Sequence, residues 1–201
     1  AVTAPAPSAG LSMVSGRHTP GPFSDATRTL VMGVVNVTPD SFSDGGQWFE
    51  PDAAIAHGRG LLADGADLLD IGGESTRPVA ARPSVEEELR RVVPVVAALA
   101  ADGARVSIDT MRAEVADAAL AAGAALVNDV SGGLADPQML PLVAAAQVSF
   151  VAMHWRGHSA HMQDNAAYGD VVAEVCRELA SRRDAALAAG VRSDRLVLDP
   201  G

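Results

Sequence analysis

Six short apolar runs in this chain each have, at or next to their carboxyl end, a side chain that could bind a ligand or take part in catalysis. The polar residues at these positions are Asn36, Asp70, Asp109, Asn128, His154 and Asp199. A single Asp or Asn in such a place commonly caps a helix or stabilises a turn. Capping explains six such positions poorly, so we expect one shared site to which every run contributes.

Three of these residues form a set of hydrogen-bond acceptors. Asp109, Asn128 and Asp199 present carboxylate and amide oxygens. Such oxygens suit the N–H-rich edge of a heterocycle, as in a pterin or a guanine. The same oxygens could instead hold a divalent cation. The residue types alone leave both uses open.

Other chemistries have less support in the sequence. The spacing of His154, His158 and His161 could bind zinc on a helix, but Gly157 and Ser159 favour a loop there. The chain has no G-x-S-x-G motif and no P-loop, and no G-x-G-x-x-G follows the first apolar run. We therefore expect neither a zinc site nor covalent serine catalysis.

The elements that must position these residues alternate along the chain. Apolar runs without polar alternation lie at 29–35, 67–71, 104–108, 124–128, 148–153 and 195–199. Such runs predict strands that are buried on both faces and therefore parallel. An open doubly wound sheet and a (β/α)8 barrel both fit this α/β pattern. We favour the barrel, because a barrel gathers the carboxyl ends of all its strands around one pocket.

Local signals mark the intervening helices. Helical patterns cover about 52–64, 85–99, 111–122, a segment that begins at 136 and a segment that ends at 190. Ser84 and Glu87 predict a capping box at the start of the second helix. Asp136 followed by Pro137 predicts an N-cap and the first helical position of the fourth.

Composition narrows the class of protein. The chain has 201 residues and a net charge of -10, and the absence of a Lys/Arg cluster argues against nucleic acid as a partner. We expect a disordered extension over 1–28 and one domain over 29–201.

Cys176 is the only cysteine, which excludes an internal disulfide, and we expect it in the core. Without a signal peptide or a membrane-spanning run, we expect a soluble cytoplasmic protein.

The segment after the first apolar run is rich in polar residues, Gly and Pro, and it cannot pack into a core. It begins at Asn36 and reads NVTPDSFSDGG. Such a segment either forms a solvated turn or does chemistry. The residue types alone leave these two uses open.

Two long stretches resemble the signature segments of the dihydropteroate synthase family. They are VMGVVNVTPDSFSDGG at 31–46 and GADLLDIGGESTRPVA at 65–80. Shorter matches follow in the family's order at 107–120, 127–133, 153–157 and 196–201. The resemblance covers about 29–201. It implies a (β/α)8 TIM barrel of the pterin-binding type, of which this chain would hold about the first six βα units.

The resemblance also implies a reaction and roles for particular residues. Enzymes of this family condense (7,8-dihydropterin-6-yl)methyl diphosphate with 4-aminobenzoate, and they release dihydropteroate and diphosphate. The matching positions imply the following roles: Asp109, Asn128 and Asp199 would bind the pterin and act in catalysis, Asn36 would be a Mg2+ ligand, and Thr76, Arg77, Pro78 and Phe42 would bind substrate. Sulfonamide analogues of 4-aminobenzoate are implied ligands, and the full-length family is expected to form homodimers.

The chain departs from the family at its end. Family members continue beyond the position of Gly201 for roughly two βα units, which carry Ser-Arg-Lys and Arg-x-His segments. We therefore expect a truncated barrel that, expressed alone, is poorly soluble and inactive. Two alternatives stay open: a pterin-dependent methyltransferase domain, although that family lacks the long TPDSFSDGG loop, and a paralogue or fragment that binds pterin without turnover.

Overall fold

The computed structural model describes residues 27–38, 51–74, 82–157 and 168–201. Within them six strands form one parallel sheet: β1 (Met32–Asn36), β2 (Leu68–Gly72), β3 (Val106–Asp109), β4 (Leu126–Asp129), β5 (Ser149–Met153) and β6 (Leu196–Asp199). All six predicted strands are present, and each begins within three residues of its predicted start. The predicted extension over 1–28 falls almost entirely outside the described residues, so it stays a prediction.

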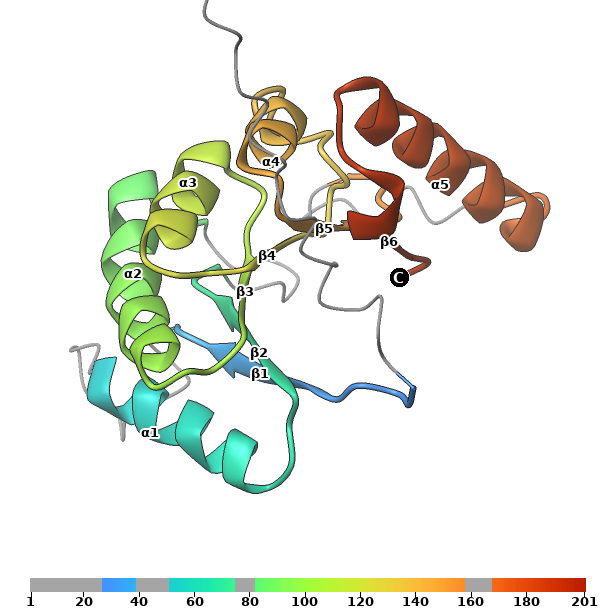
Figure 1. The fold of residues 1–201 in the computed structure, drawn as a ribbon. Coiled ribbons are helices and arrows are strands. Elements are labelled where there is room, and N and C mark those ends of the chain that lie inside the picture. Colours follow the sequence, from blue (N-terminus) through green and yellow to red (C-terminus); the bar gives the residue numbers. More distant parts are fainter. Residues whose placement is uncertain (1–26, 39–50, 75–81, 158–167) are drawn as a thin grey trace, which may run out of the picture.

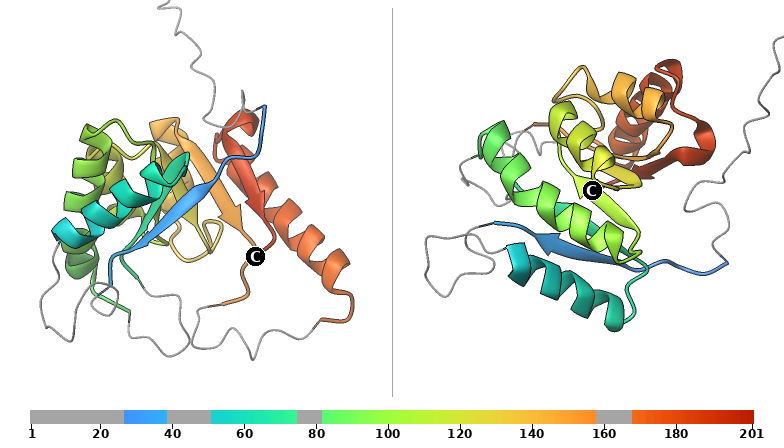
Figure 2. Two further views of the ribbon diagram at one scale, coloured as in Figure 1. Left: turned by 90° about the horizontal axis from the view of Figure 1, so that it is seen from below. Right: turned by 60° about the vertical axis from the view of Figure 1, so that its left-hand side comes forward.

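The strand order identifies the architecture. The sheet runs β1-β2-β3-β4-β5-β6, whereas a doubly wound sheet reverses direction part of the way along. The sheet is curved, and the helices lie along its outer side (Figures 1 and 2). The chain therefore forms six consecutive strands of a barrel together with the five α-helices that connect them, as predicted.

Five α-helices connect and cover the strands. They are α1 (Pro51–Ala63), α2 (Val85–Ala101), α3 (Ala113–Ala121), α4 (Met139–Ala146) and α5 (Val171–Ala188), and a 3-10 turn (Ser193–Arg195) precedes β6. None of the helices in the described part of the chain is long and apolar enough to cross a membrane.

The alternation of side chains along the strands creates two apolar layers. The larger layer lies between sheet and helices, and it includes Ile71, Ile108 and Phe150 together with Val96 of α2. A smaller cluster of Leu68, Leu126 and Val151 lies on the opposite face of the sheet. Successive strand residues point to opposite faces, so this second face is the inner side of the curved sheet.

Only one of the two hydrogen bonds of the predicted capping box forms at the start of α2. Ser84 Oγ accepts a hydrogen bond from the Glu87 N–H at 3.2 Å, and Val92 of this helix is fully buried. The Glu87 carboxylate does not return to Ser84 as a capping box requires. It binds Arg90 and Arg91 one turn further along, because two guanidinium groups are within its reach.

Two predictions about local structure are wrong. Asp136 is not an N-cap: its carboxylate accepts hydrogen bonds from the N–H groups of Gln138 and of Ala113, and α4 begins only at Met139. Asp136 thus stabilises a turn and joins it to the start of α3. Cys176 is exposed rather than buried, because α5 buries only a narrow stripe at Leu179 and Ala186.

Candidate active site

Strand register places the predicted polar residues on one face. Asn36 pairs with Gly72, Gly72 with Asp109, and Asp109 with Asn128. Residues at one level of a parallel sheet project to the same side. Asn128 also pairs with Val151, a member of the small apolar cluster, so this level faces the inner side of the sheet.

Asp199 lies on the same face, one layer further along. Its partner on β5 is Met153, two residues beyond Val151, and a step of two keeps a side chain on the same face. The acceptors Asp109, Asn128 and Asp199 therefore converge at the carboxyl ends of β3, β4 and β6. Their side chains face the side of the sheet that the helices leave uncovered.

Asp70 belongs to this site, although the set of acceptors proposed from the sequence omitted it. The side-chain Nδ2 of Asn128 donates to Asp70 Oδ2 at 2.8 Å. This contact leaves the side-chain oxygen Oδ1 of Asn128 available to accept a hydrogen bond from a ligand. Burial raises the pKa of the Asp70 carboxyl. Its position was a usable signal, because a lone Asp inside the fully buried strand LLDIG is costly unless it has a partner.

A second polar layer lies beneath the first. Asp70 pairs with Ser107, and the same row continues through Leu126 to Ser149. Ser149 Oγ is buried without a hydrogen-bond partner among the described residues, and a hydrogen bond from Ser107 lowers the pKa of Asp70 against the effect of burial. Two layers of the inner face at this end thus contain polar side chains beside Leu126 and Val151, and apolar packing alone does not account for them.

Asp109 has an unusual ionisation. Burial, together with the negative charges of Asp70 and Asp129, raises the pKa of its carboxyl to about 8. At neutral pH the carboxyl is therefore largely protonated. A ligand that donates N–H groups or brings positive charge stabilises the carboxylate form, so ligand binding and loss of this proton are coupled.

Two strand-end groups do not join the site. The His154 Nε2 lies 2.7 Å from Glu178 Oε2 of α5, and the Arg156 guanidinium pairs with Glu174 and Glu178 and covers the Tyr168 ring. Both side chains are thus turned to α5. The prediction that every strand contributes to one site is wrong for β5.

The residues at the rim fit a magnesium ion better than a zinc ion. No group of three or more His, Cys, Asp and Glu side chains in the described segments could hold a metal; His158 and His161 lie outside those segments. Asn36 ends β1 with an exposed side chain. Mg2+ commonly keeps several waters and uses one or two protein oxygens together with substrate phosphates, so one amide oxygen at the rim fits this ion.

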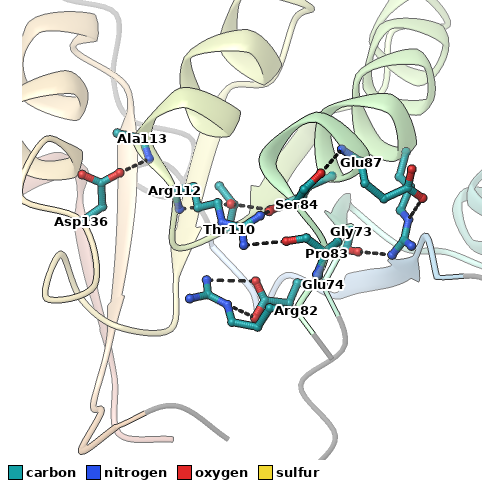
Figure 3. A network of polar contacts seen from close by, with 12 residues as sticks. Gly73, Glu74, Arg82, Pro83, Ser84, Glu87, Thr110, Arg112, Ala113 and Asp136 are labelled. Carbon is teal, nitrogen blue, oxygen red and sulfur yellow. Dashed lines mark hydrogen bonds and ion pairs between the residues drawn. The ribbon is translucent and has the colours of Figure 1, made fainter. Parts of the chain in front are cut away.

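Four predicted substrate-binding residues lie outside the described part of the chain: Phe42, Thr76, Arg77 and Pro78. The residues that border the second of these segments are described. Arg82 Nε and Nη2 donate to Glu74 Oε1 and Oε2 at 2.6 and 3.1 Å, as Figure 3 shows. This two-bond ion pair joins the residues on either side of 75–81.

Comparisons with known proteins agree with this geometry. The family model described as "Pterin binding enzyme" matches residues 32–201. The dihydropteroate synthase of Mycobacterium leprae is 58% identical over 172 residues, which are 85% of this chain and 61% of that protein. A solved Xanthomonas albilineans dihydropteroate synthase with 4-aminobenzoic acid superposes with a TM-score of 0.80 at 52% identity, over 87% of this chain and 62% of the other.

A third comparison is with Burkholderia cenocepacia dihydropteroate synthase complexed with 7,8-dihydropteroate, which has a TM-score of 0.76 at 43% identity over 87% of this chain and 59% of the other. The chain thus spans about three fifths of the length of these relatives. The family match extends over all six strands and over the polar inner face described above. This chain belongs to the family of pterin-binding enzymes.

Proposed function

We propose that the protein carrying this chain is a dihydropteroate synthase. It would condense (7,8-dihydropterin-6-yl)methyl diphosphate with 4-aminobenzoate to give dihydropteroate and diphosphate. The observation that carries the proposal is the row of acceptors at the ends of β3, β4 and β6. The relatives with 4-aminobenzoic acid and with 7,8-dihydropteroate support the same reaction.

The acceptor row suits the donor edge of a pterin. That edge carries an amino group and ring N–H groups, which need oxygen acceptors when they leave water. Asp109 and Asp199 supply carboxylates, and Asn128 supplies a carbonyl oxygen that Asp70 holds in orientation through the amide nitrogen. A ring that lacks these donors would leave the half-buried acceptors unsatisfied, so the site would discriminate against it.

The reaction replaces one bond at the exocyclic methylene. The bond from carbon to the diphosphate oxygen breaks with its electron pair on the diphosphate, the arylamine nitrogen forms the new C–N bond, and that nitrogen then loses a proton. Positive charge develops on the pterin as the leaving group departs. The carboxylates of Asp109 and Asp199 are fixed at strand ends, so they stabilise that charge without reorganisation.

Asn36 is the residue that would hold Mg2+ in this proposal. The ion would supply positive charge that neutralises the departing diphosphate. A test independent of turnover is Mg2+-dependent affinity for inorganic diphosphate, measured by calorimetry in the parent and in Asn36→Ala. We expect the Mg2+ enhancement of binding to fall at least tenfold in the variant.

The proposed reaction is tested on the complete natural polypeptide that contains these residues. Dihydropteroate formation from the two substrates is followed by chromatography in the parent and in Asp109→Asn. Product from the parent and at least a hundredfold less from the variant would support the proposal. Tight pterin binding without product would instead identify a non-catalytic pterin-binding protein, and methyl transfer from a methylated pterin would identify a methyltransferase.

Three further expectations depend on the same resemblance. We propose that the protein acts in the cytoplasm, forms a homodimer and binds sulfonamide analogues of 4-aminobenzoate. Fractionation of cells that express the natural protein tests the first. Sedimentation equilibrium tests the second, and competition of a sulfonamide with 4-aminobenzoate tests the third.

A further inference from the structure

A buried carboxylate lies behind the strand end that carries Asp109. Glu88 of α2 is completely inaccessible to solvent. Its Oε1 accepts a hydrogen bond from the Thr110 hydroxyl at 2.6 Å, and its Oε2 pairs with Arg112 Nη1 at 2.7 Å. Glu88 therefore joins α2 to the loop between β3 and α3.

Thr110 directly follows Asp109, and both its hydroxyl and its N–H are engaged in hydrogen bonds. The hydroxyl donates to Glu88 and accepts from the Arg112 N–H at 3.2 Å. The Thr110 N–H donates to the carbonyl oxygen of Asn128 at 3.0 Å. The turn that begins at Asp109 is thus held on one side by α2 and on the other by the strand that carries Asn128.

Arg112 extends these contacts to the residues that flank 75–81. Its Nη2 donates to the Pro83 carbonyl oxygen at 2.7 Å, and Figure 3 shows this contact beside Thr110. On the other flank, a Cβ added at Gly73 would lie 3.0 Å from Glu88 Cγ, so the backbone there packs directly on the Glu88 side chain. Both flanks rest against the same group of side chains.

Stability alone is a weak reason for such an arrangement. A buried ion pair is costly to desolvate, and apolar residues of similar volume often stabilise a fold as well or better. Hydrogen bonds are directional, so they hold the groups they join in a defined geometry, which apolar packing does less well. Here they hold the backbone beside Asp109 and Asn128.

We propose that Glu88, Thr110 and Arg112 form a positioning unit that sets the placement of the Asp109 carboxyl group for the pterin. The inference rests on the proposed function. Their side chains hydrogen-bond within the unit and to the Pro83 carbonyl oxygen, and the contact of Thr110 with Asn128 is between main-chain atoms, so they are positioning residues rather than catalytic ones. They act through Asp109, and this distinguishes the proposal from a general role in folding.

The first test compares two substitutions of Thr110 in the complete natural protein. Thr110→Val keeps the shape but removes the hydroxyl, and we expect kcat/KM for the pterin diphosphate to fall about tenfold to a hundredfold, because small misplacements in a site are costly. Thr110→Ser keeps the hydroxyl and should stay within about threefold of the parent. Arg59→Gln, which removes an exposed ion pair with Asp102 on α1 and α2, is the control and should leave the rate unchanged.

The second test asks whether the effect passes through Asp109. Affinity for the pterin diphosphate is measured by calorimetry in the parent, Thr110→Val, Asp109→Asn and the double variant. If Thr110 positions Asp109, the Thr110→Val loss disappears in the Asp109→Asn background. An equal loss in both backgrounds, or a Thr110→Ser variant as weak as Thr110→Val, overturns the inference.

The binding test still gives an answer if Thr110→Val does not fold or if the parent protein forms no product. If Thr110→Val does not fold, Arg112→Lys takes its place in the same cycle, because lysine can still pair with Glu88 but cannot also reach Pro83 with a second rigid donor. If the parent binds the pterin diphosphate but forms no dihydropteroate, the proposed function fails, while the binding cycle still decides whether Thr110 acts through Asp109.

Discussion

At the scale of single residues, Asp109 links structure to function through its ionisation. Its carboxyl is at the end of β3, and burial raises the pKa to about 8. Holding this group in a buried position lowers the free energy of unfolding at neutral pH, and it favours ligands that donate hydrogen bonds or bring positive charge. Two measurements follow from this one property.

The first is a stability measurement as a function of pH. The folded state retains the Asp109 proton up to about pH 8, whereas the unfolded chain releases it near the ordinary pKa of 3.8. The free energy of unfolding therefore falls as the pH rises through this window and levels off above it. Asp109→Asn removes this penalty, so its melting temperature should exceed that of the parent by several degrees at pH 8 and by much less at pH 4. An equal difference at both pH values would contradict the assigned cause.

The second is the pH dependence of pterin affinity. Because the donor-rich edge binds the carboxylate form, the association constant should rise by about tenfold per pH unit below pH 8 and then reach a plateau. Calorimetry with the pterin diphosphate from pH 6 to pH 9 measures this. The profile should be flat in Asp109→Asn, and a slope retained in that variant would assign the titration to another group.

At the scale of elements, α2 supports the site although it packs on the outer side of the sheet. Its N-terminal residue Ser84 caps the helix, and Glu88 one turn later contacts the loop after β3. The first turn is also acidic, with Glu86 and Glu87 near the positive end of the helix dipole. The helix start is thus both stable in itself and part of the support of Asp109.

Removal of the Ser84 cap should destabilise α2 locally. We expect Ser84→Ala to lower the free energy of unfolding by about 1 kcal/mol, because one N–H of the first turn loses its acceptor. Urea denaturation followed by circular dichroism provides the value. The matched control is Ser181→Ala in the interior of α5, where alanine is the better helix former, and an equal loss in the two variants would rule out capping as the cause.

At the scale of the whole molecule, the sheet has two edges within the described residues. β1 and β6 each pair with only one neighbour, and Val34 and Leu198 on them are 53% and 38% exposed. Unpaired parallel edges with exposed apolar side chains favour association between chains. The chain covers 61% of the Mycobacterium leprae relative, so about two fifths of that protein lie outside the match.

This arrangement predicts the behaviour of residues 1–201 expressed alone. The fragment should associate at micromolar concentration, as measured by light scattering, and should form no dihydropteroate. A chimaera that adds the C-terminal two fifths of the Mycobacterium leprae relative should be monodisperse, because both edges gain a partner. A monodisperse, active 201-residue fragment would show that edge closure is unnecessary.

The sequence by itself determined the elements and their order. Apolar runs without alternation and helical periodicity are local patterns, and they placed the start of each of the six strands to within three residues. The motif segments also pointed to the residues at the ends of β1, β3, β4 and β6. Each of these patterns depends only on residues that are close together in the sequence, so it can be recognised without the tertiary structure.

Only the tertiary structure decided which polar groups meet. Asp70 and Asn128 are 58 residues apart, and their contact depends on the register of three strands rather than on any local pattern. The same holds for Glu88 and Thr110, for His154 turned towards α5, and for Cys176 on the exposed side of its helix. Burial and long-range pairing are set by how whole elements pack, and spacing along the chain cannot specify them.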